Sequence, residues 1–504
     1  MRAPHFRPAI AVLDLGKAIG PVRMAFFASL LLSLIAVWNN PVLNRDGMLY
    51  IEWAQKIINN GSEGLYYAGQ PFLLALPLLI SGLSWATGLS PEAAGQLLNA
   101  LFLAGTCALI VVITRNRRPE ASWAACLVVL AMPAYNGYRG EILREYGFWF
   151  FSVLAIWLAM RWDESPPWRE AILCQVSIGL AAMFRLEAVA FYPALMAWQL
   201  FSAPPGLRLR RAFMIGCLPV AGVLVAAMIY GSGLIEFPTR MAYFLEAANP
   251  LRKIQMLDEA GKKISDAGLL KYKFSREEAG YILFFGLLSI IPMKFIQMSG
   301  ALLVPFIFLF ITQPARAALA RWHPLTWAFL AYTCVLAAFV THMFFLTGRY
   351  VSLLNLLAVP IIAVGLALMM DRFPRWRALT VAVALTMMLA NVVSFSPKKT
   401  HMLEAGAWLA GNVKDASRVY VDDGRIGFYA GLGIVGTGQM KMDRTELSKA
   451  IAENRFDMIA MEVAKKDADF ETWAAENRLH ILKRFSNKAG NAVVVAVVTT
   501  GTDR

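Results

Sequence analysis

The architecture of this chain follows from the stretch VRMAFFASLLLSLIAVW (residues 22–38), which is followed by NNPVLNRDG (39–47) and MLYIEWAQKIINN (48–60). The first segment is apolar enough and long enough for a membrane span. In the last segment, Gly47, Ile51, Ala54 and Ile58 share one helical face, whereas Glu52, Gln55, Lys56 and Asn59 lie elsewhere. This pattern predicts an amphipathic helix that lies on the membrane.

Asp46 stands at the start of this predicted helix, at the bilayer surface, with Tyr50 one turn further along. A carboxylate held there is well placed to act on a lipid-linked substrate. Asp is also a common N-cap residue, because its side-chain oxygen accepts a hydrogen bond from the first helical turn. The segment alone leaves both roles of Asp46 open.

The composition is that of a membrane protein with many spans. Of 504 residues, 58% are hydrophobic and 16% are charged, and the mean hydropathy of +0.53 is far above that of water-soluble proteins. The net charge of +14 comes mainly from short loops between apolar runs, which the positive-inside rule explains, so nucleic acid is excluded as a partner. The five cysteines all lie in apolar runs, which excludes a disulfide framework. The sequence has no glycine-rich phosphate loop, which disfavours nucleotide-driven pumps and enzymes that use sugar nucleotides.

About eleven segments are long enough to span a membrane: 22–39, 93–114, 120–136, 146–161, 168–184, 187–203, 212–233, 291–312, 325–346, 351–370 and 378–394. With a cytoplasmic N-terminus, the arginine-rich loops between these segments fall inside. This agreement requires that 70–89 does not span, so we interpret it as a juxtamembrane or re-entrant pair of helices broken near Ser81 and Gly82. We interpret 279–290 as membrane-lying as well. The predicted fold is mainly α and polytopic, with about 11 to 13 spans.

A second polar group follows in the next predicted outer loop, Arg139-Gly140-Glu141-Ile142-Leu143-Arg144-Glu145-Tyr146. On a helix, Glu141 and Glu145 would share one face and repel each other by roughly a few tenths of a kcal/mol unless a cation or a substrate intervenes. Arg139 and Arg144 are available as partners. Surface charges of this kind are usually solvated, but their occurrence together with Asp46 in the first two outer loops predicts a single pocket.

Two arginines border predicted spans: Arg185 in Phe184-Arg185-Leu186-Glu187, and Arg349 in Gly348-Arg349-Tyr350. Arginine suits a phosphate in a partly dry site, because its planar fork donates bidentately and keeps its charge. His342 lies seven residues before Arg349, which would put both on one helix face, and there a ligand or catalytic role competes with simple packing. Candidates for stacking on a sugar, with interfacial anchoring as the alternative, are Tyr66, Tyr67 and Tyr138.

Residues 1–394 are predicted to form the membrane domain, and residues 395–504 a separate soluble domain. Short apolar strand candidates at 419–421, 458–461 and 492–498 alternate with helical stretches at 399–412, 444–455 and 468–478, which predicts an α/β sandwich. An odd number of spans places this domain outside. Asp422-Asp423-Gly424 follows the first strand, and we interpret it as a strand-ending turn rather than a metal site.

In combination, these motifs resemble the GT-C superfamily of membrane glycosyltransferases. The motifs are a membrane-lying helix after the first span, Arg45-Asp46-Gly47-x-x-Tyr50, the acidic loop 141–145, the Phe184-Arg185-x-Glu187 turn and Gly348-Arg349-Tyr350. Within the superfamily, the chain is most similar to the bacterial transferases that include the protein O-mannosyltransferases and the lipid A aminoarabinose transferase. The resemblance covers residues 22 to about 394 in layout.

The resemblance implies a donor in which phosphate joins a sugar to a polyprenol, and an active site on the outer face. It implies that Asp46 is the catalytic carboxylate and that Glu141 or Glu145 occupies the second acidic position. Many relatives have Asp-Glu where this chain has Arg45-Asp46, so no neighbouring carboxylate helps Asp46. Metal dependence varies across the superfamily, which leaves a divalent metal open, and no other cofactor is implied.

The predicted function is transfer of a sugar from a polyprenyl-phosphate donor to a lipid, glycan or protein acceptor at the periplasmic face of a bacterial inner membrane. Asp46 would act as the base of an inverting displacement, and the departing phosphate would be stabilised by Arg349 and Arg185. The remaining predicted substrate-binding residues are Tyr50, Tyr67, Arg144, Glu187, His342 and Tyr350. Two alternatives stay open: a flippase or other transporter of lipid-linked glycans, which should show charges or broken helices at mid-membrane, and a polysaccharide polymerase or ligase.

Overall fold

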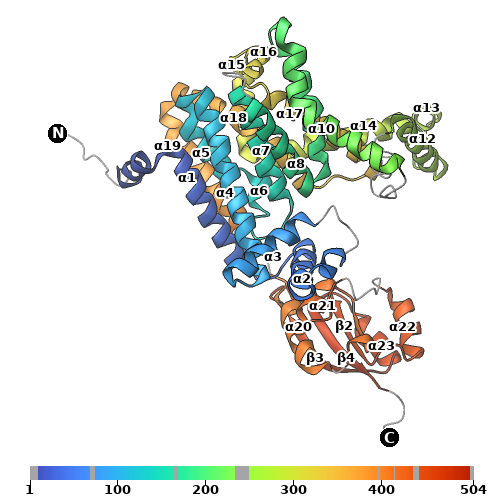
Figure 1. The fold of residues 1–504 in the computed structure, drawn as a ribbon. Helices are drawn as coiled ribbons and strands as arrows, with labels where there is room; N and C mark the ends of the chain where they lie inside the picture. The colour runs from blue at the N-terminus through green and yellow to red at the C-terminus, as the bar shows by residue number, and fades with distance from the viewer. Residues whose placement is uncertain are drawn as a thin grey trace. The chain divides into compact units, whose positions relative to one another are not determined.

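The computed structural model describes residues 10–67, 74–162, 168–232, 249–393, 398–413, 415–434 and 442–499 (Figure 1). The chain divides into two compact units. The first comprises Met1–Ser33, Ala100–Arg139 and Arg144–Val392, and the second comprises Leu34–Asn99, Gly140–Leu143 and Val393–Arg504. The second unit therefore includes the segment after the first predicted span and part of the acidic loop, both of which the sequence prediction placed in a membrane domain of residues 1–394.

In its described residues, the first unit consists of helices and their connections (Figure 1). The helices that contribute to it are α1 (Ile10–Asn39), α4 (Pro91–Arg117), α5 (Ser122–Ala131), α6 (Pro133–Asn136), α7 (Glu145–Trp162), α8 (Trp168–Phe184), α9 (Phe191–Ser202), α10 (Arg208–Gly231), α12 (Pro250–Asp266), α13 (Lys273–Glu277), α14 (Ala279–Ser299), α15 (Leu303–Thr312), α16 (Ala315–Ala320), α17 (Leu325–Met343), α18 (Gly348–Arg372) and α19 (Arg377–Val392). Helices α1 and α4 extend into the second unit.

Helix α18 forms the core of the first unit. Its residues from Val351 to Leu366 are buried on every face, as expected for a helix that is apolar all round, and it packs against α5, α14, α15 and α17. Two of its buried polar side chains donate hydrogen bonds to neighbouring segments: Ser352 donates to the carbonyl of Ala134 at 2.5 Å, and Asn355 donates to the Ser299 hydroxyl at 2.9 Å. These contacts fix the N-terminal end of α18, which carries Arg349 and Tyr350.

Six helices in the described residues are long and apolar enough to cross a membrane: Gly20–Asn39, Pro91–Arg117, Pro205–Ile229, Ala279–Thr312, Leu325–Met343 and Gly348–Arg372. The prediction of a mainly helical, polytopic membrane protein is thereby confirmed. Other predicted spans coincide with shorter helices, such as α5 with 10 residues and α9 with 12. At about 1.5 Å per residue these cover about half of a hydrocarbon core of roughly 30 Å, so the total of about eleven stays a prediction.

The predicted break near Ser81 and Gly82 in the segment 70–89 is wrong. Residues 70–73 lie outside the described residues, and α3 runs from Ala75 to Thr87 without a break at Ser81 or Gly82. A single glycine costs a helix only about 1 kcal/mol, and the surrounding leucine and isoleucine residues outweigh it. The 13 residues of α3 extend about 20 Å, which is too short to cross a membrane unaided.

The predicted boundary near residue 290 is also wrong. Helix α14 runs without interruption from Ala279 to Ser299, and the chain breaks at Gly300 before α15 begins. Gly300 has a φ of +55°, a conformation that glycine adopts without steric cost. The segment 279–290 is therefore the first half of one apolar helix, and the predicted span 291–312 is divided between α14 and α15.

The second unit combines two helices, α2 (Arg45–Asn60) and α3, with a small α/β fold (Figure 1). The α/β fold has the strands β1 (Val419–Val421), β2 (Met458–Val463), β3 (Leu479–Ser486) and β4 (Ala492–Val498), and the helices α20 (Thr400–Asn412), α21 (Gly424–Tyr429), α22 (Arg444–Ala452) and α23 (Phe470–Glu476). The sheet order is β1-β2-β4-β3. Strands β1 and β2 are parallel, and the other two pairs are antiparallel.

Helices cover both faces of this sheet. Tyr420 packs in a cluster with residues of α22 and α23, whereas its neighbours Val419 and Val421 pack with α20 and α21. The predicted strands at 419–421 and 492–498 coincide with β1 and β4. Strand β3 was not predicted, because Lys483 and Arg484 interrupt its apolar alternation, and charged residues are usual on an edge strand.

Candidate functional site

Charged side chains meet in the first unit where α8 ends. Arg185 is the extended residue between α8 and the 3-10 helix η4 (Leu186–Ala190). One guanidinium nitrogen of Arg185 donates to Glu145 at 2.8 Å, and another donates to Glu187 at 2.6 Å. The same oxygen of Glu145 lies 3.5 Å from Nε of Arg349. Four residues from three separate predicted motifs thus form one ionic cluster.

The cluster is buried at one end and more exposed to solvent at the other. The side chains of Glu145 and Arg185 are 3% and 5% exposed, whereas those of Glu187 and Arg349 are 20% and 27% exposed. Burying a charge is costly unless partners compensate, and here two carboxylates balance two guanidinium groups. Arg349 is the most accessible cation of the cluster, and it is suited to bind an anion that arrives from solvent.

Aromatic rings support the two arginines. The Arg185 guanidinium carbon lies 4.4 Å from the centre of the Tyr350 ring, and that of Arg349 lies 5.4 Å from it, both within the range of cation–π attraction. The buried Tyr332 of α17 donates a hydrogen bond to the backbone carbonyl of Tyr350 at 2.9 Å. The start of α18 is thereby fixed beside Arg185. Tyr332 was not singled out in the sequence, because nothing local distinguishes it from other aromatic residues of a span.

Arg144 and Arg139 differ in their surroundings. The charge of Arg144 acts on Glu187, which places Arg144 near the cluster. Arg139 is 3% exposed, and its partners in the described residues are neutral: Asn136 at 2.7 Å, and Ser29 and Ser33 of α1 at 2.9 and 3.0 Å. The expectation that Arg139 is available to Glu145 is therefore wrong: Asn136 and the serines of α1 engage its Nε and Nη1, and Glu145 pairs with Arg185 and Arg349.

Glu141 and Glu145 do not share a helix face. Helix α7 begins at Glu145, and Glu141 lies in the preceding non-helical loop. The loop is fixed by long-range contacts that outweigh helix formation: Asn99 donates to the backbone carbonyl of Glu141 at 3.3 Å, and the neighbouring Ile142 pairs with Asn44. Glu145 belongs to the ionic cluster of the first unit, whereas Glu141 belongs to the second unit.

His342 and Arg349 are not on one helix either. Helix α17 ends at Met343, where Phe344 has a φ of +59°, and α18 begins only at Gly348. The cations whose charge acts on His342 are Lys253 and Arg252 of α12, and Lys253 donates to the carbonyl of Ala338 on α17 at 2.9 Å. The structure therefore associates His342 with α12.

Asp46 lies in the first turn of α2, and the N-cap is Asn44. The capping role considered for Asp46 is therefore wrong. The Asn44 amide pairs with the backbone of Ile142 in both directions: its oxygen accepts from the Ile142 N–H at 3.0 Å, and its nitrogen donates to the Ile142 carbonyl at 3.3 Å. This pair connects the start of α2 to the acidic loop next to Glu141. Asp46 itself is partly exposed.

Tyr50 and Tyr67 are engaged within the second unit. Tyr50 is 4% exposed, and the Tyr67 hydroxyl donates to Glu52. Burial does not follow the predicted apolar face of α2: Glu52, which lies off that face, is 7% exposed, while Ile58 on it is 42% exposed.

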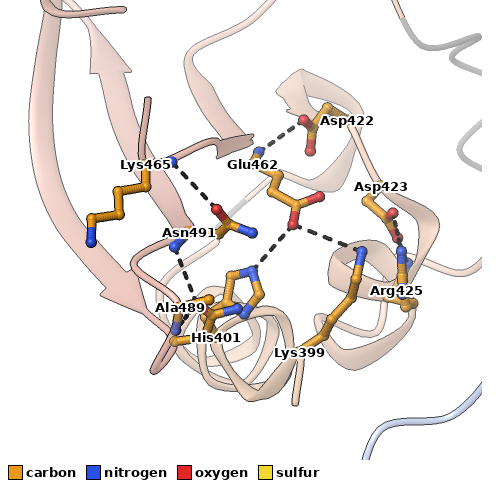
Figure 2. A network of polar contacts seen from close by, with 10 residues as sticks. Lys399, His401, Asp422, Asp423, Arg425, Glu462, Lys465, Ala489 and Asn491 are labelled. Carbon is orange, nitrogen blue, oxygen red and sulfur yellow. Dashed lines mark hydrogen bonds and ion pairs between the residues drawn. The ribbon is translucent and has the colours of Figure 1, made fainter. Parts of the chain in front are cut away.

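A further polar network lies at the carboxyl ends of β1 and β2 (Figure 2). Glu462 contacts His401 at 3.4 Å and Lys399 at 3.8 Å, and its backbone N–H donates to Asp422 at 2.8 Å. Asp423 caps α21 by accepting from the Arg425 N–H. Burial raises the pKa of Asp423, but hydrogen bonds from Arg425 outweigh this effect and lower the pKa to about 2. The interpretation of Asp422-Asp423-Gly424 as a turn is thus confirmed.

In the described parts of the chain, no three His, Cys, Asp or Glu side chains come together as a group that could hold a metal ion. Within the ionic cluster, Glu145 and Glu187 are bridged by Arg185, whose charge opposes a cation at that point. We therefore assign no residue to a metal.

No family model and no curated protein matches this chain. Solved structures do match it. An oligosaccharyltransferase of Archaeoglobus fulgidus, tethered to an acceptor peptide with the NVT sequon, is 12% identical with a TM-score of 0.55, over 94% of this chain and 74% of that chain. The ArnT of Cupriavidus metallidurans bound to undecaprenyl phosphate is 13% identical with a TM-score of 0.52, over 93% of this chain and 97% of that chain. The chain has a GT-C fold. The resemblance noted in the sequence is confirmed at the level of the fold.

Proposed function

We propose that this protein is an integral membrane glycosyltransferase that moves a sugar from a polyprenyl-phosphate donor to an acceptor at the periplasmic face of a bacterial inner membrane. The observation that carries the proposal is the ionic cluster at the start of α18, in which the partly exposed Arg349 is held beside the dry pair of Arg185 and Glu145. The GT-C fold supports it, since one protein with this fold was solved with undecaprenyl phosphate bound.

In the proposed reaction, an acceptor nucleophile attacks the anomeric carbon of the sugar while Asp46 takes the acceptor's proton. The bond between the anomeric carbon and the phosphate oxygen breaks, and the lipid phosphate leaves with the electron pair. This leaving group gains negative charge, which Arg349 stabilises by hydrogen bonding. A single displacement of this kind inverts the configuration of the anomeric carbon.

The other residues of the cluster hold Arg349 in place. A carboxylate oxygen of Glu145 lies 3.5 Å from its Nε, and Arg185 neutralises Glu145 so that the carboxylate does not attract Arg349 away from a phosphate. The ring of Tyr350 makes cation–π contacts with the guanidinium groups of both Arg185 and Arg349. In this proposal Glu145, Glu187 and Arg185 are positioning residues, and Arg349 contacts the donor. Glu141 stays a candidate for the second acidic position, in the loop whose neighbouring Ile142 pairs with Asn44 before α2.

A donor panel tests the proposal. Purified protein in liposomes of phosphatidylethanolamine and phosphatidylglycerol is incubated with undecaprenyl phosphate that carries labelled glucose, mannose, galactose or aminoarabinose, together with a bacterial envelope extract as acceptor. We expect label to leave one of these lipids and enter the extract. Label that moves only from the matching sugar nucleotides, included as a control set, would contradict the proposal.

Arg349 is expected to bind the donor's phosphate bidentately, through two N–H groups of its planar guanidinium. Arg349→Lys keeps the charge but acts only as a point charge, so we expect the affinity for undecaprenyl phosphate to fall about tenfold, and about a hundredfold in Arg349→Ala. Titration of the lipid against the protein in detergent measures both. Arg372→Ala, at the exposed far end of the same helix, is the matched control. Equal affinity in the wild type and both Arg349 variants would show that Arg349 does not bind the phosphate.

A further inference from the structure

The helix that carries Asp46 is held by residues from the other end of the chain. Immediately before α2, the backbone N–H of Leu43 donates to the hydroxyl of Tyr429 at 3.0 Å. Leu43 is 3% exposed, so this N–H has little access to water and depends on its protein partner. Tyr429 is the last residue of α21, and both residues belong to the second unit. This contact is the first of two anchors.

The second anchor is Glu52, two turns into α2. One of its carboxylate oxygens accepts from the backbone N–H of Ile434 at 2.7 Å, and the other accepts from the Tyr67 hydroxyl. A carboxylate that is only 7% exposed is stable when such donors replace water. Hydrogen bonds to an ionised group are also stronger than those between neutral groups. The chain from Tyr429 to Ile434 therefore contacts α2 at both of its anchors.

Gly433 makes this close approach possible. Its φ is +78°, and an added Cβ would lie 2.6 Å from the carboxylate oxygen of Glu52. Any other residue would be strained in its backbone and would collide with Glu52. The glycine thus allows the backbone of the loop that precedes Ile434 to pack directly against the carboxylate of Glu52.

Asp46 lies between the two anchors. It follows Leu43 by three residues and precedes Glu52 by six, which places Asp46 and Glu52 about 120° apart around the helix axis. When Glu52 faces the 429–434 loop, Asp46 stays partly exposed. The pair between Asn44 and Ile142 connects the same turn of α2 to the acidic loop. Contacts with residues outside α2 therefore fix the rotation of α2 about its axis. They also fix the position along that axis of the turn that carries Asp46.

We propose that Glu52 and Tyr429 are positioning residues for Asp46, and that the C-terminal α/β fold sets the direction of the Asp46 carboxylate through the 429–434 loop. This inference rests on the proposed function, in which Asp46 is the base. A displacement of about 1 Å in a reacting group can cost a rate of about a hundredfold. The C-terminal residues thereby contribute to the rate of transfer without contacting the donor.

Two variants test the anchors separately. Tyr429→Phe removes only the acceptor of the Leu43 N–H, and Glu52→Gln keeps the size of the side chain while removing its charge. Glu476→Gln, an exposed carboxylate in α23 of the same fold, is the matched control. The hydrogen–deuterium exchange rates of the backbone amides of residues 43–60 measure, in the absence of substrate, how firmly α2 is held in place. Transfer from the lipid-linked sugar that the donor panel identifies gives kcat and the KM for the donor.

We expect faster exchange in α2 and a kcat at least about tenfold lower in both variants, with the donor KM within about twofold of wild type, because neither change touches Arg349. The double variant should lose no more than about the larger single loss, since both anchors act on one helix. Unchanged exchange and kcat in Tyr429→Phe would overturn the proposal even if Glu52→Gln fails to fold. Faster exchange with normal kcat would overturn the positioning role. An active Asp46→Asn variant would instead place the failure in the proposed function.

Discussion

Asp46→Asn is expected to lose nearly all transfer activity while the protein keeps its fold. The substitution preserves the size of the side chain and removes the base, which is typically worth about 10²- to 10⁴-fold in rate. Asn44 is the N-cap residue of α2, and Asp46 lies in the first turn. Asn keeps a side-chain oxygen that can accept from the first turn, so the substitution should leave the helix intact. The measurement is kcat with the donor found by the panel, alongside the melting temperature of the variant. We expect kcat to fall by that factor and the melting temperature to stay within a few degrees.

The control for Asp46 is Glu63→Gln, an exposed carboxylate in the 3-10 helix η1 (Glu63–Tyr66) that follows α2. It should transfer at the wild-type rate. If Asp46→Asn folds and transfers as fast as this control, Asp46 is not the base, and the acidic loop with Glu141 becomes the place to search for one.

Arg185→Met is expected to destabilise the first unit and to abolish donor binding. Arg185 satisfies Glu145, whose side chain is 3% exposed, and Glu187 at the same time. Removing one partner of a buried ion pair typically costs about 3–5 kcal/mol, because the remaining charge is left in a dry site. Unfolding by denaturant in detergent measures the free energy, and titration with undecaprenyl phosphate measures the binding.

A second substitution shows whether the cost comes from the uncompensated carboxylate. Arg185→Met combined with Glu145→Gln removes both charges, so part of the lost stability should return, whereas donor binding should stay weak because Arg349 has lost its support. Wild-type stability in Arg185→Met alone would mean that Arg349 compensates Glu145 completely, and the dry ionic cluster would then not depend on Arg185.

The sequence predicted which side chains are chemically suited to the site better than it predicted which residues those side chains contact in the fold. Arg185 and Arg349 were chosen as residues that suit a phosphate at a membrane border. The structure brings them together with Glu145 and with Glu187 and Tyr350 of the same two motifs. Their residue types and their places at the ends of apolar runs are local signals. Which carboxylate each arginine contacts depends on how α7, α8 and α18 pack, and no local pattern records that packing.

Where predictions failed, a long-range contact outweighed a local preference. Arg139 was expected near Glu141, but serines on α1 bind it. Glu52 lies off the predicted apolar face of α2, yet it is buried, and Ile434, which lies far along the chain, donates to it. The break at Phe344 separates His342 from Arg349, although their spacing of seven residues had predicted one shared helix face. Helices were therefore predicted well from apolar runs, and their interruptions poorly.

The alternative of a transporter draws support from two features that were not evident in the sequence. Arg139 is buried against α1 with neutral partners in the described residues, and α14 and α15 are separated by a break at Gly300. Buried cations and interrupted helices occur in transporters as well as in enzymes. A transporter and a transferase differ in whether the bond between the sugar and the phosphate is broken.

The most direct test of this account is therefore a single-turnover measurement of free undecaprenyl phosphate. Protein in excess over the labelled donor found by the panel is mixed with acceptor, and the lipid products are separated over time for the wild type and for Asp46→Asn. We predict that the wild type releases one undecaprenyl phosphate for each sugar transferred, and that Asp46→Asn releases almost none. A donor that crosses the liposome membrane with its sugar still attached, at equal rates in both proteins, would contradict the account.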